Sequence, residues 1–444
     1  MNCTAKGRAG ALLLGVFVIC SADLSGGQRI VWTSRFGDRP WSWNEDLRDR
    51  GLAVAVDPSG NVYAGGVGFL RKYSPNGGEL WKKDFANDTV LGLAVDATGN
   101  VYAAFRSALI RKYDPNGTEL WSRTTAPRPD IAVSGAGSIY VTNYEFSSEG
   151  GVRKLDANGS QVWLRTFGAP RGIAERPHPA VDAAGNVYVA ATVLDFTGKY
   201  DVVLKKYDAN GAEIWTLTFG ALPSEWDRVN GVAVDPGGNI YLVGTTTGAF
   251  PGQGEGLPGF VRKFNANGAE LWTRQFGPIQ SVPVTPQDVA TDASGNAYVV
   301  GTVIGTLPGQ SSKNAYYDAF IRKYDAAGNE LSSYQFAFDT RFDYAFGVAV
   351  DRNGGAYVIG GTENFGLDAD AFLTKFVSCA SPPGDVNGDC VLNCDDLAAV
   401  QALIGKRPAQ RGWYPPADLV PDNVIDLRDL VFISRKLPAG TRCP

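Results

Sequence analysis

The chain of 444 residues contains a single histidine and a single methionine, and its 41 basic residues are outnumbered by 46 acidic ones. The resulting net charge of −5 comes with no polybasic run, so we expect no nucleic-acid partner. The histidine, His178, lies between two prolines, which indicates an exposed loop position rather than a catalytic base. The sequence contains neither a serine elbow nor a phosphate loop, and residues 21–378 contain no cysteine that could act as a nucleophile.

Long apolar runs are also missing, apart from one near the N-terminus. There Lys6 and Arg8 precede the apolar residues 11–19, and the small residue Ala22 follows. This order is typical of a secretory signal over residues 1–22, because the run is too short to span a bilayer. Cys20 leaves lipid attachment as an alternative, which the bulky Ile19 before it disfavours. We therefore expect an exported bacterial protein, secreted or at the cell surface, without a membrane span.

The four cysteines that follow the signal all lie near the C-terminus, at Cys379, Cys390, Cys394 and Cys443. Four cysteines confined to one small region of an exported chain indicate two disulfides. Three pairings are possible, of which we favour Cys390–Cys394 within a loop and Cys379–Cys443 between the ends of the region.

The dominant feature of the sequence is an internal repeat. One copy has a short β-branched segment from Gly51, an Asp-x-x-Gly-Asn turn at Asp57, a second segment through Tyr63, a third around Lys72, and a fourth at Trp81 after an Asn-Gly turn. Asn-Gly between alternating segments is a strong hairpin signal. The unit therefore predicts a four-stranded antiparallel meander of about 40–50 residues, the size of a propeller blade.

Three segments of the repeat can be counted separately, and each count gives seven. The acidic turn recurs at Asp57, Asp96, Asp182, Asp235, Asp292 and Asp351, with a degenerate copy at Ser134. The basic strand recurs at Lys72, Lys112, Lys154, Lys206, Lys263, Lys323 and Lys375. The Trp strand recurs at Trp32, Trp81, Trp121, Trp163, Trp215 and Trp272, with Ser332 in the last copy.

The three counts are out of phase. The first Trp strand, 29–36, precedes every acidic turn, and the last basic strand, 371–376, has no Trp strand after it. A ring closes if the N-terminal strand completes the last blade, which also removes a sheet edge. We predict a mainly β fold: a seven-bladed β-propeller over 28–379 closed by the N-terminal strand, then a small α-helical module.

The segment Tyr317-Asp-Ala-Phe-Ile-Arg-Lys-Tyr and the Gly-Thr pair at 301–302 resemble the SBBP family of bacterial β-propeller repeats. The resemblance covers residues 28–379 approximately and implies the fold, but it implies almost nothing about activity. The repeated Asn-Gly-Glu-Leu-Trp run also resembles quinone-dependent dehydrogenase propellers. Those proteins generally have eight blades and a propeller disulfide, which are missing here.

After a linker at 380–384, the composition changes. Residues 385–396 place oxygen-bearing side chains at positions 1, 3, 5, 9 and 12 of a calcium loop, followed by a helical run. The expected Ca²⁺ ligands are Asp385, Asn387, Asp389, Val391 through its carbonyl, Asn393 and Asp396. A weaker second loop contains Asp418, Asp422, Val424, Asp426 and Asp429, and Val420 removes one ligand oxygen from it.

Two such loop–helix units in tandem resemble a dockerin module over 385–444. The pairs Cys394-Asp395 and Leu427-Arg428 lack the small hydroxyl residues with which dockerins bind cohesin. We therefore expect calcium binding, and we regard a cohesin-like docking partner as doubtful.

A side chain that recurs in every repeat is interpreted as architectural, which applies to the repeated lysines, aspartates and tryptophans. Long variable loops on one face carry aromatic residues with charged neighbours, which would suit a sugar or a peptide. The candidates there are Trp41, Trp43, Trp226, Arg228 and Tyr344. The alternative is that these loops are merely tolerated insertions.

Three classes of function follow from these features. The first is a secreted, non-enzymatic binding or display protein for a carbohydrate or protein ligand. The second is a carbohydrate-active enzyme, a polysaccharide hydrolase or lyase, with loop carboxylates such as Asp46, Glu225 or Asp343 as its acids. The third and weakest is the quinone-dependent dehydrogenase.

Overall fold

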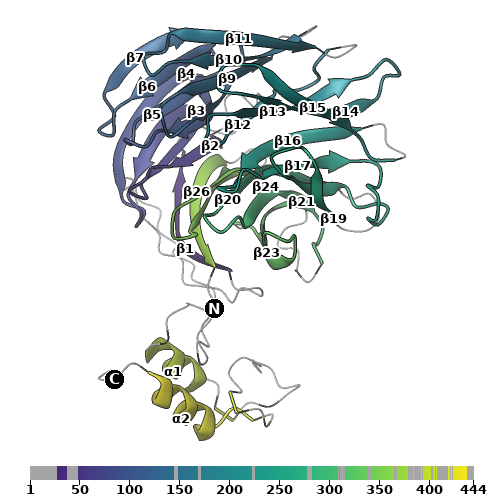
Figure 1. Ribbon diagram of the computed structural model, residues 1–444. Coiled ribbons are helices and arrows are strands. Elements are labelled where there is room, and N and C mark those ends of the chain that lie inside the picture. The colour runs from purple at the N-terminus through teal and green to yellow at the C-terminus, as the bar shows by residue number, and fades with distance from the viewer. Residues whose placement is uncertain are drawn as a thin grey trace.

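The computed structural model describes residues 28–37, 49–144, 149–168, 172–222, 226–277, 283–308, 316–338, 342–364 and 368–378 of the β region. In the C-terminal region it describes residues 394–401 and 424–437 and some single residues around them. The described chain forms a large body of antiparallel sheets and two short helices (Figure 1). None of the described helices is long and apolar enough to cross a membrane.

The strands of the β body belong to five hydrogen-bonded sheets. The six-stranded sheet contains β2 (Gly51–Val56), β3 (Val62–Tyr73), β4 (Glu79–Val95), β5 (Val101–Phe105), β6 (Leu109–Tyr113) and β7 (Glu119–Thr124). Three four-stranded sheets follow: β8 (Asp130–Val133), β9 (Ile139–Tyr144), β10 (Glu149–Leu155) and β11 (Gln161–Gly168); β12 (His178–Val181), β13 (Val187–Leu194), β14 (Tyr200–Tyr207) and β15 (Glu213–Phe219); β16 (Asp227–Val234), β17 (Ile240–Thr246), β18 (Gly259–Phe264) and β19 (Glu270–Phe276).

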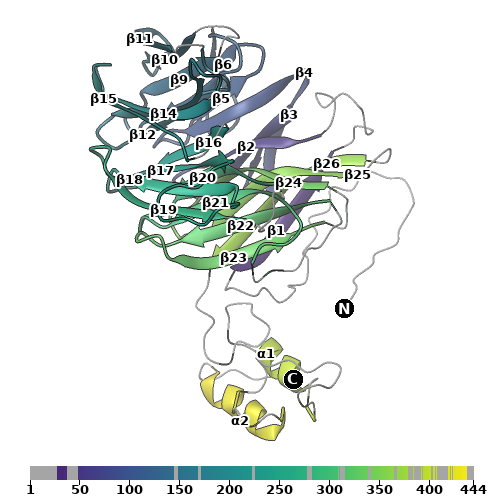
Figure 2. The same cartoon turned by 90° about the vertical axis from the view of Figure 1, so that its right-hand side faces the viewer.

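The eight-stranded sheet brings together the two ends of the β body (Figure 2). It contains β20 (Val284–Thr291), β21 (Ala297–Ile304), β22 (Tyr317–Tyr324), β23 (Glu330–Phe336), β24 (Phe342–Val350), β25 (Ala356–Asn364), β26 (Asp368–Ser378) and β1 (Gln28–Phe36). In it β1 pairs antiparallel with β26, from Gln28 opposite Ser378 to Phe36 opposite Ala371.

The predicted fold class is wrong as stated, because the described strands do not form seven separate four-stranded blades. Only three of the five sheets are separate four-stranded sheets. β4 runs without a break from Glu79 to Val95 and pairs with both β3 and β5, which merges two repeats. A parallel pair between Tyr317 of β22 and Phe342 of β24 merges two more. The mainly β, propeller character of the chain remains.

In every repeat except the one with Ser134, the acidic turn is held by its own aspartate. The backbone N–H groups of Ser59 and Asn61 donate to Asp57 Oδ1 at 2.9 Å, and Asn61 Nδ2 donates to Oδ2 at 2.8 Å. Burial alone would raise the pKa of the equivalent Asp96, but hydrogen bonds from Thr98 and Asn100 hold it below its ordinary value. The turn therefore keeps its carboxylate charged.

The repeated lysines pair with these aspartates, as an architectural role requires. Five such ion pairs are described, at 3.4–3.9 Å: Lys72–Asp57, Lys112–Asp96, Lys263–Asp235, Lys323–Asp292 and Lys375–Asp351. Each of these ammonium groups also lies over the ring of a repeated tyrosine, at 4.6–4.9 Å from its centroid. Buried charges of this kind are stable only when they are paired and hydrogen-bonded.

The repeated tryptophans join each repeat to the next. Each indole Nε1 donates at 3.1–3.2 Å to a carbonyl in a turn of the following repeat: Trp32 to Pro75, Trp81 to Pro115, Trp121 to Ala157, Trp163 to Ala209, Trp215 to Ala266, and Trp272 to Ala326. We call these contacts the seams. A glycine at positive φ faces the indole in most of them. A Cβ on Gly328 would approach the Trp272 ring to 2.7 Å.

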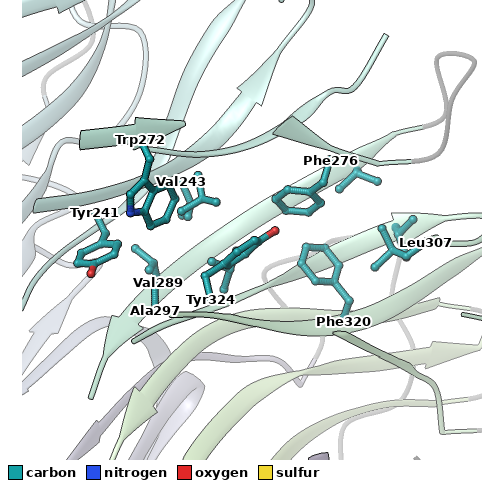
Figure 3. Close-up of a cluster of buried hydrophobic side chains, with 13 residues drawn as sticks. Tyr241, Val243, Trp272, Phe276, Val289, Ala297, Leu307, Phe320 and Tyr324 are labelled. Carbon is teal, nitrogen blue, oxygen red and sulfur yellow. The ribbon is translucent and has the colours of Figure 1, made fainter. Parts of the chain in front are cut away.

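The hydrophobic core lies between neighbouring sheets. In Figure 3, Trp272 and Phe276 of β19 approach Tyr324 and Phe320 of β22. The T-shaped pair Phe276–Phe320 has its ring centroids 5.8 Å apart. Contacts of this kind make each sheet depend on its neighbour for burial of its apolar face.

The C-terminal region contains α1 (Cys394–Gln401) and α2 (Leu427–Lys436), which pack around Val400, Ile425 and Ile433. The predicted dockerin-like module is a second error in the fold class, because the described part of this region contains only these two short helices. Among the described residues, no three acidic, histidine or cysteine side chains lie close enough to hold a metal ion.

Candidate functional site

The first strands of neighbouring repeats lie side by side around a central cavity of about 580 Å³. In order around the cavity, these strands are β2, the C-terminal part of β4, β8, β12, β16, β20 and β24, and β24 contacts β2. Because all of them line one cavity, side chains from any of them can enter a space that all the repeats share.

One position on these strands separates the repeats into two groups. Each repeat has a tyrosine on its second strand. The position pairs with the residue that follows this tyrosine by two places in the sequence. In four described repeats this position is small: Ala53, Gly92, Gly231 and Gly347. In the other three it is ionisable: Asp130, His178 and Asp288. A β-bulge precedes or includes the position on β2, β4, β16, β20 and β24. Bulges of this kind often re-aim side chains next to functional sites.

Two of these ionisable residues form a pair. The ring Nδ1 of His178 lies 2.9 Å from Asp130 Oδ2, so the carboxylate accepts its N–H and leaves Nε2 as the second ring nitrogen. Arg176 Nη2 lies 3.7 Å from the same oxygen, and Arg176 Nη1 donates to the carbonyl of Leu91 at 3.0 Å. Burial alone would raise the pKa of Asp130, but Arg176 and His178 hold it below its ordinary value.

The third residue, Asp288, is in a different environment. Burial raises the pKa of its carboxyl to about 7, and the charge of Asp130 adds to this effect. Its oxygens accept the backbone N–H groups of Val289 at 2.8 Å and of Val348, on the neighbouring strand β24, at 2.9 Å. Asp288 therefore joins two strands and also titrates near neutral pH.

Beside the cavity lies a group of side chains that we call the rim cluster: Trp226, Tyr200, Arg228 and Glu175. Trp226 stacks on Tyr200 at 4.7 Å and 24° and is 44% exposed. The Arg228 guanidinium lies 5.0 Å from the Trp226 ring and forms an ion pair with Glu175 at 2.9 Å. Arg228 precedes the cavity-lining Asn230 by two residues, and Glu175 directly precedes Arg176, so the cluster adjoins the cavity.

A second aromatic group leads toward the cavity along β24. Phe342, Tyr344 and Phe346 alternate along the strand with nearly parallel rings, and Phe346 lines the cavity. Arg50 lies 5.5 Å from the Tyr344 ring and donates to Glu363 at 2.6 Å. The predicted residues Trp226, Arg228 and Tyr344 thus lie in two aromatic groups beside the same cavity.

Other predicted residues cannot be placed. Trp41, Trp43, Cys379, Cys390, Cys443, Asp385, Asn387, Asp389, Val391, Asn393 and Asp418 lie outside the described residues, as do Asp46 and Glu225. Asp396 lies in α1, and Cys394 is disulfide-bonded. Asp343 is fully buried in β24, so it is not a loop acid.

The interpretation of His178 as an exposed loop residue is wrong, because it begins β12 and pairs with Asp130 inside the cavity. The cavity acids Asp130 and Asp288 were not predicted at all. A signal was present in the sequence, since each of the three replaces a small residue at one fixed position of the repeat.

In the second C-terminal loop, a guanidinium lies among the carboxylates expected to bind calcium. Arg428 forms ion pairs with Asp422 and with Asp426, the latter at 2.7 Å. Both oxygens of the buried Asp429 accept backbone N–H groups, from Val420 at 2.9 Å and Asp426 at 2.7 Å. The prediction of a weaker second site is consistent with this arrangement, and calcium binding stays a prediction.

The repeated turns, the seams and the shared central cavity define a β-propeller repeat protein. A model of SBBP β-propeller repeats matches residues 271–305. The model of the family described as outer membrane protein assembly factor BamB matches residues 22–248, just over half of the chain. The chain therefore belongs to that family. Neither model extends into the C-terminal region, so the dockerin resemblance gains no support.

Two solved structures share the fold at low sequence identity, and a third matches with a lower TM-score. The match to "Structure of U3-55K" has a TM-score of 0.51 at 12% identity, and the aligned region covers 77% of this chain and 98% of that one. The match to "Crystal structure of RRP9 WD40 repeats" has a TM-score of 0.50 at 12% identity and covers 77% of this chain and 97% of that one. The match to BamB from Moraxella catarrhalis has a TM-score of 0.43 at 14% identity and covers 78% of this chain and 100% of that one. No curated protein matches the chain.

Proposed function

We propose that the protein is an exported, non-enzymatic β-propeller that binds an extracellular carbohydrate at the rim cluster. The observation that carries the proposal is the stacked pair Trp226–Tyr200, whose outer ring remains 44% exposed although large aromatic side chains are usually buried. Exposed aromatic rings with a fixed orientation provide flat apolar surfaces for sugar rings. Arg228 and Glu175 add hydrogen-bonding groups beside that surface.

Export has separate support. The signal-like segment at residues 1–22 and membership in a family described as an outer membrane protein assembly factor both favour an exported protein. A protein ligand is the second candidate, because the family name refers to protein assembly. The experiment below separates the two ligands.

The test is retention of the mature protein on a panel of insoluble and soluble polysaccharides, with an assay for released reducing ends. Wild-type protein should be retained without sugar release, and Trp226→Ala should lose retention. Phe196→Ala is the matched control, because Phe196 is 77% exposed and makes no ring contact with the described residues. Retention of Trp226→Ala equal to wild type would reject the rim cluster. Sugar release would replace the binding function by a polysaccharide-cleaving one, and failure to bind any polysaccharide would favour a protein ligand.

We further propose that the first C-terminal loop binds one Ca²⁺ through Asp385, Asn387, Asp389, Asn393 and Asp396 and the carbonyl of Val391. The second loop should bind none at micromolar concentration, because Arg428 already neutralises Asp422 and Asp426. Calorimetric titration of the EGTA-treated chain should give one site, which Asp389→Ala removes and Asp422→Ala leaves. Two sites, or none, would contradict this assignment.

A further inference from the structure

The charged side chains that line the central cavity already have partners. Asp130 lies 3.7 Å from the Arg176 guanidinium, and both oxygens of Asp288 accept backbone N–H groups. Arg106 and Arg128 are engaged with partners as well. A charged ligand would have to displace one of these partners or bury its own charge without one, and both are costly. The cavity wall therefore favours a neutral ligand.

The groups that do have capacity for a ligand are neutral. Three residues of the cavity wall contribute them: His178, Asn230 and Gln287. Among the described residues, no hydrogen-bond partner faces the Nε2 atom of His178, the Oδ1 atom of Asn230 or the side-chain amide of Gln287. Since polar groups that lose water without gaining a partner are costly, a bound ligand must satisfy them.

Two of these three groups are hydrogen-bond acceptors. Asp130 accepts the Nδ1–H group of His178 at 2.9 Å, so Nε2 of the neutral ring is an acceptor. The amide nitrogen of Asn230 donates to the carbonyl of Pro286 at 2.6 Å, which leaves its oxygen as an acceptor. Carboxylate and phosphate oxygens have no hydrogen to donate to either group. An ammonium group could donate, but it would lie near the Arg176 guanidinium. Neutral hydroxyl groups meet both requirements.

An apolar surface accompanies these polar groups. The three residues lie on β12, β16 and β20, which are consecutive around the cavity, and Phe346 lines it from the next strand, β24. A sugar ring has hydroxyl groups around its edge and apolar C–H groups on its faces, so it can use both surfaces together. The cavity volume of about 580 Å³ is in the range of small-molecule sites.

The β24 aromatic residues extend this surface away from the cavity. Phe342, Tyr344 and Phe346 have nearly parallel rings, inclined to each other by 5° and 13° along the strand, and none of the three is fully buried. The row ends at the cavity with Phe346. It therefore offers ring surfaces to further sugar residues of a chain whose end lies in the cavity.

We propose that the central cavity binds the neutral terminal sugar of a saccharide chain. Its hydroxyl groups donate to His178 Nε2 and Asn230 Oδ1 and form hydrogen bonds with the Gln287 amide, and an apolar face of the sugar contacts Phe346. This inference rests on the proposed carbohydrate-binding function and names the ligand class of its inner part.

The experiment is calorimetric titration of the mature full chain with glucose and galactose, and with glucuronate and galacturonate as their charged counterparts. Wild-type protein should bind at least one of the two neutral sugars with a Kd on the order of 1 mM. The uronate of that sugar should bind at least about tenfold more weakly, because its carboxylate finds no unpaired cation in the cavity.

Gln287→Ala is the variant that tests the site, because its side-chain amide has no described partner and its loss should leave the fold intact. It should weaken binding of the neutral sugar by about three- to tenfold. Gln161→Ala is the matched control, since Gln161 is exposed on the outermost strand β11 and should leave the affinity unchanged. Both variants are first checked for an unchanged unfolding midpoint.

The outcomes separate the two proposals. No binding of either neutral sugar, equal or tighter binding of the uronate, or binding that Trp226→Ala abolishes and Gln287→Ala leaves unchanged would overturn the cavity assignment. Polysaccharide retention that depends on Trp226 would then still support the rim function. Neutral-sugar binding that Gln287→Ala weakens, in protein that no polysaccharide retains, would support the cavity and reject the rim function.

Discussion

The seams and the central cavity are built from the same repeats, yet they use polar side chains in opposite ways. At the seams, each tryptophan, lysine and aspartate recurs from repeat to repeat and finds the same partners. In the cavity, Asp130, His178 and Asp288 stand at a position where the other four described repeats have Ala or Gly. Repetition thus identifies the residues that hold the fold, and departure from repetition identifies candidates for binding. The following predictions test that division, from the largest expected effect to the smallest.

The largest effect should come from a seam tryptophan. Trp272→Ala would remove an indole that is 8% exposed, packs on Tyr241 and Tyr324 and donates to the carbonyl of Ala326. The free energy of unfolding should fall by about 3–5 kcal/mol, measured by urea denaturation. Leu271→Ala, its half-exposed neighbour on β19, is the control and should change stability by less than about 1 kcal/mol. Similar losses in both variants would break the comparison.

A seam lysine should have the next largest effect. Lys263 is 3% exposed, lies 3.5 Å from Asp235 and donates to the carbonyl of Ala326 at 3.0 Å. Lys263→Met leaves the buried carboxylate without its cation, so we expect a loss of about 3 kcal/mol in urea denaturation. The exposed Lys199→Met should change stability by less than about 0.5 kcal/mol. If Lys263→Met proved neutral, the repeated pairs would not be structural.

In the cavity, Asp288 should affect stability through pH. Its pKa is raised by burial to about 7, above the unfolded value, so the folded state binds more protons between the two values. The stabilisation that this raised pKa contributes to the folded state is therefore fully present below pH 4 and is lost as the pH rises through about 7. Between pH 5 and 8 the wild type should lose about 2–3 kcal/mol more stability than Asp288→Asn, in parallel urea titrations. Parallel pH profiles would contradict the raised pKa.

The smallest effect on stability should come from the rim cluster. Trp226→Ala removes a side chain that is already 44% exposed, so unfolding should change by less than about 1 kcal/mol. Its effect should appear in polysaccharide retention instead. A large loss of stability would indicate that Trp226 has a structural role, like the repeated tryptophans, rather than a binding role.

Much of the fold was predictable because the repeat is local. The turn residues and the architectural role of the repeated aspartates, lysines and tryptophans follow from short segments, and in the structure these residues form ion pairs and hydrogen bonds. The number of separate sheets was predicted wrongly. Whether β4 breaks between repeats, or Tyr317 bonds to Phe342, depends on how neighbouring repeats approach each other. In the C-terminal region, loop spacing alone did not reveal that Arg428 lies between Asp422 and Asp426.

The sequence by itself determined the β repeat, its propeller class and the structural role of its recurring residues, because each depends on hydrogen bonds and packing within or between adjacent repeats. Only the tertiary structure decided the candidate site. Asp130, Arg176, His178 and Asp288 are spread over more than 150 residues of the chain. They meet because the first strands of the repeats surround one cavity. A local sequence pattern gives no information about which residues of distant repeats face each other across that cavity.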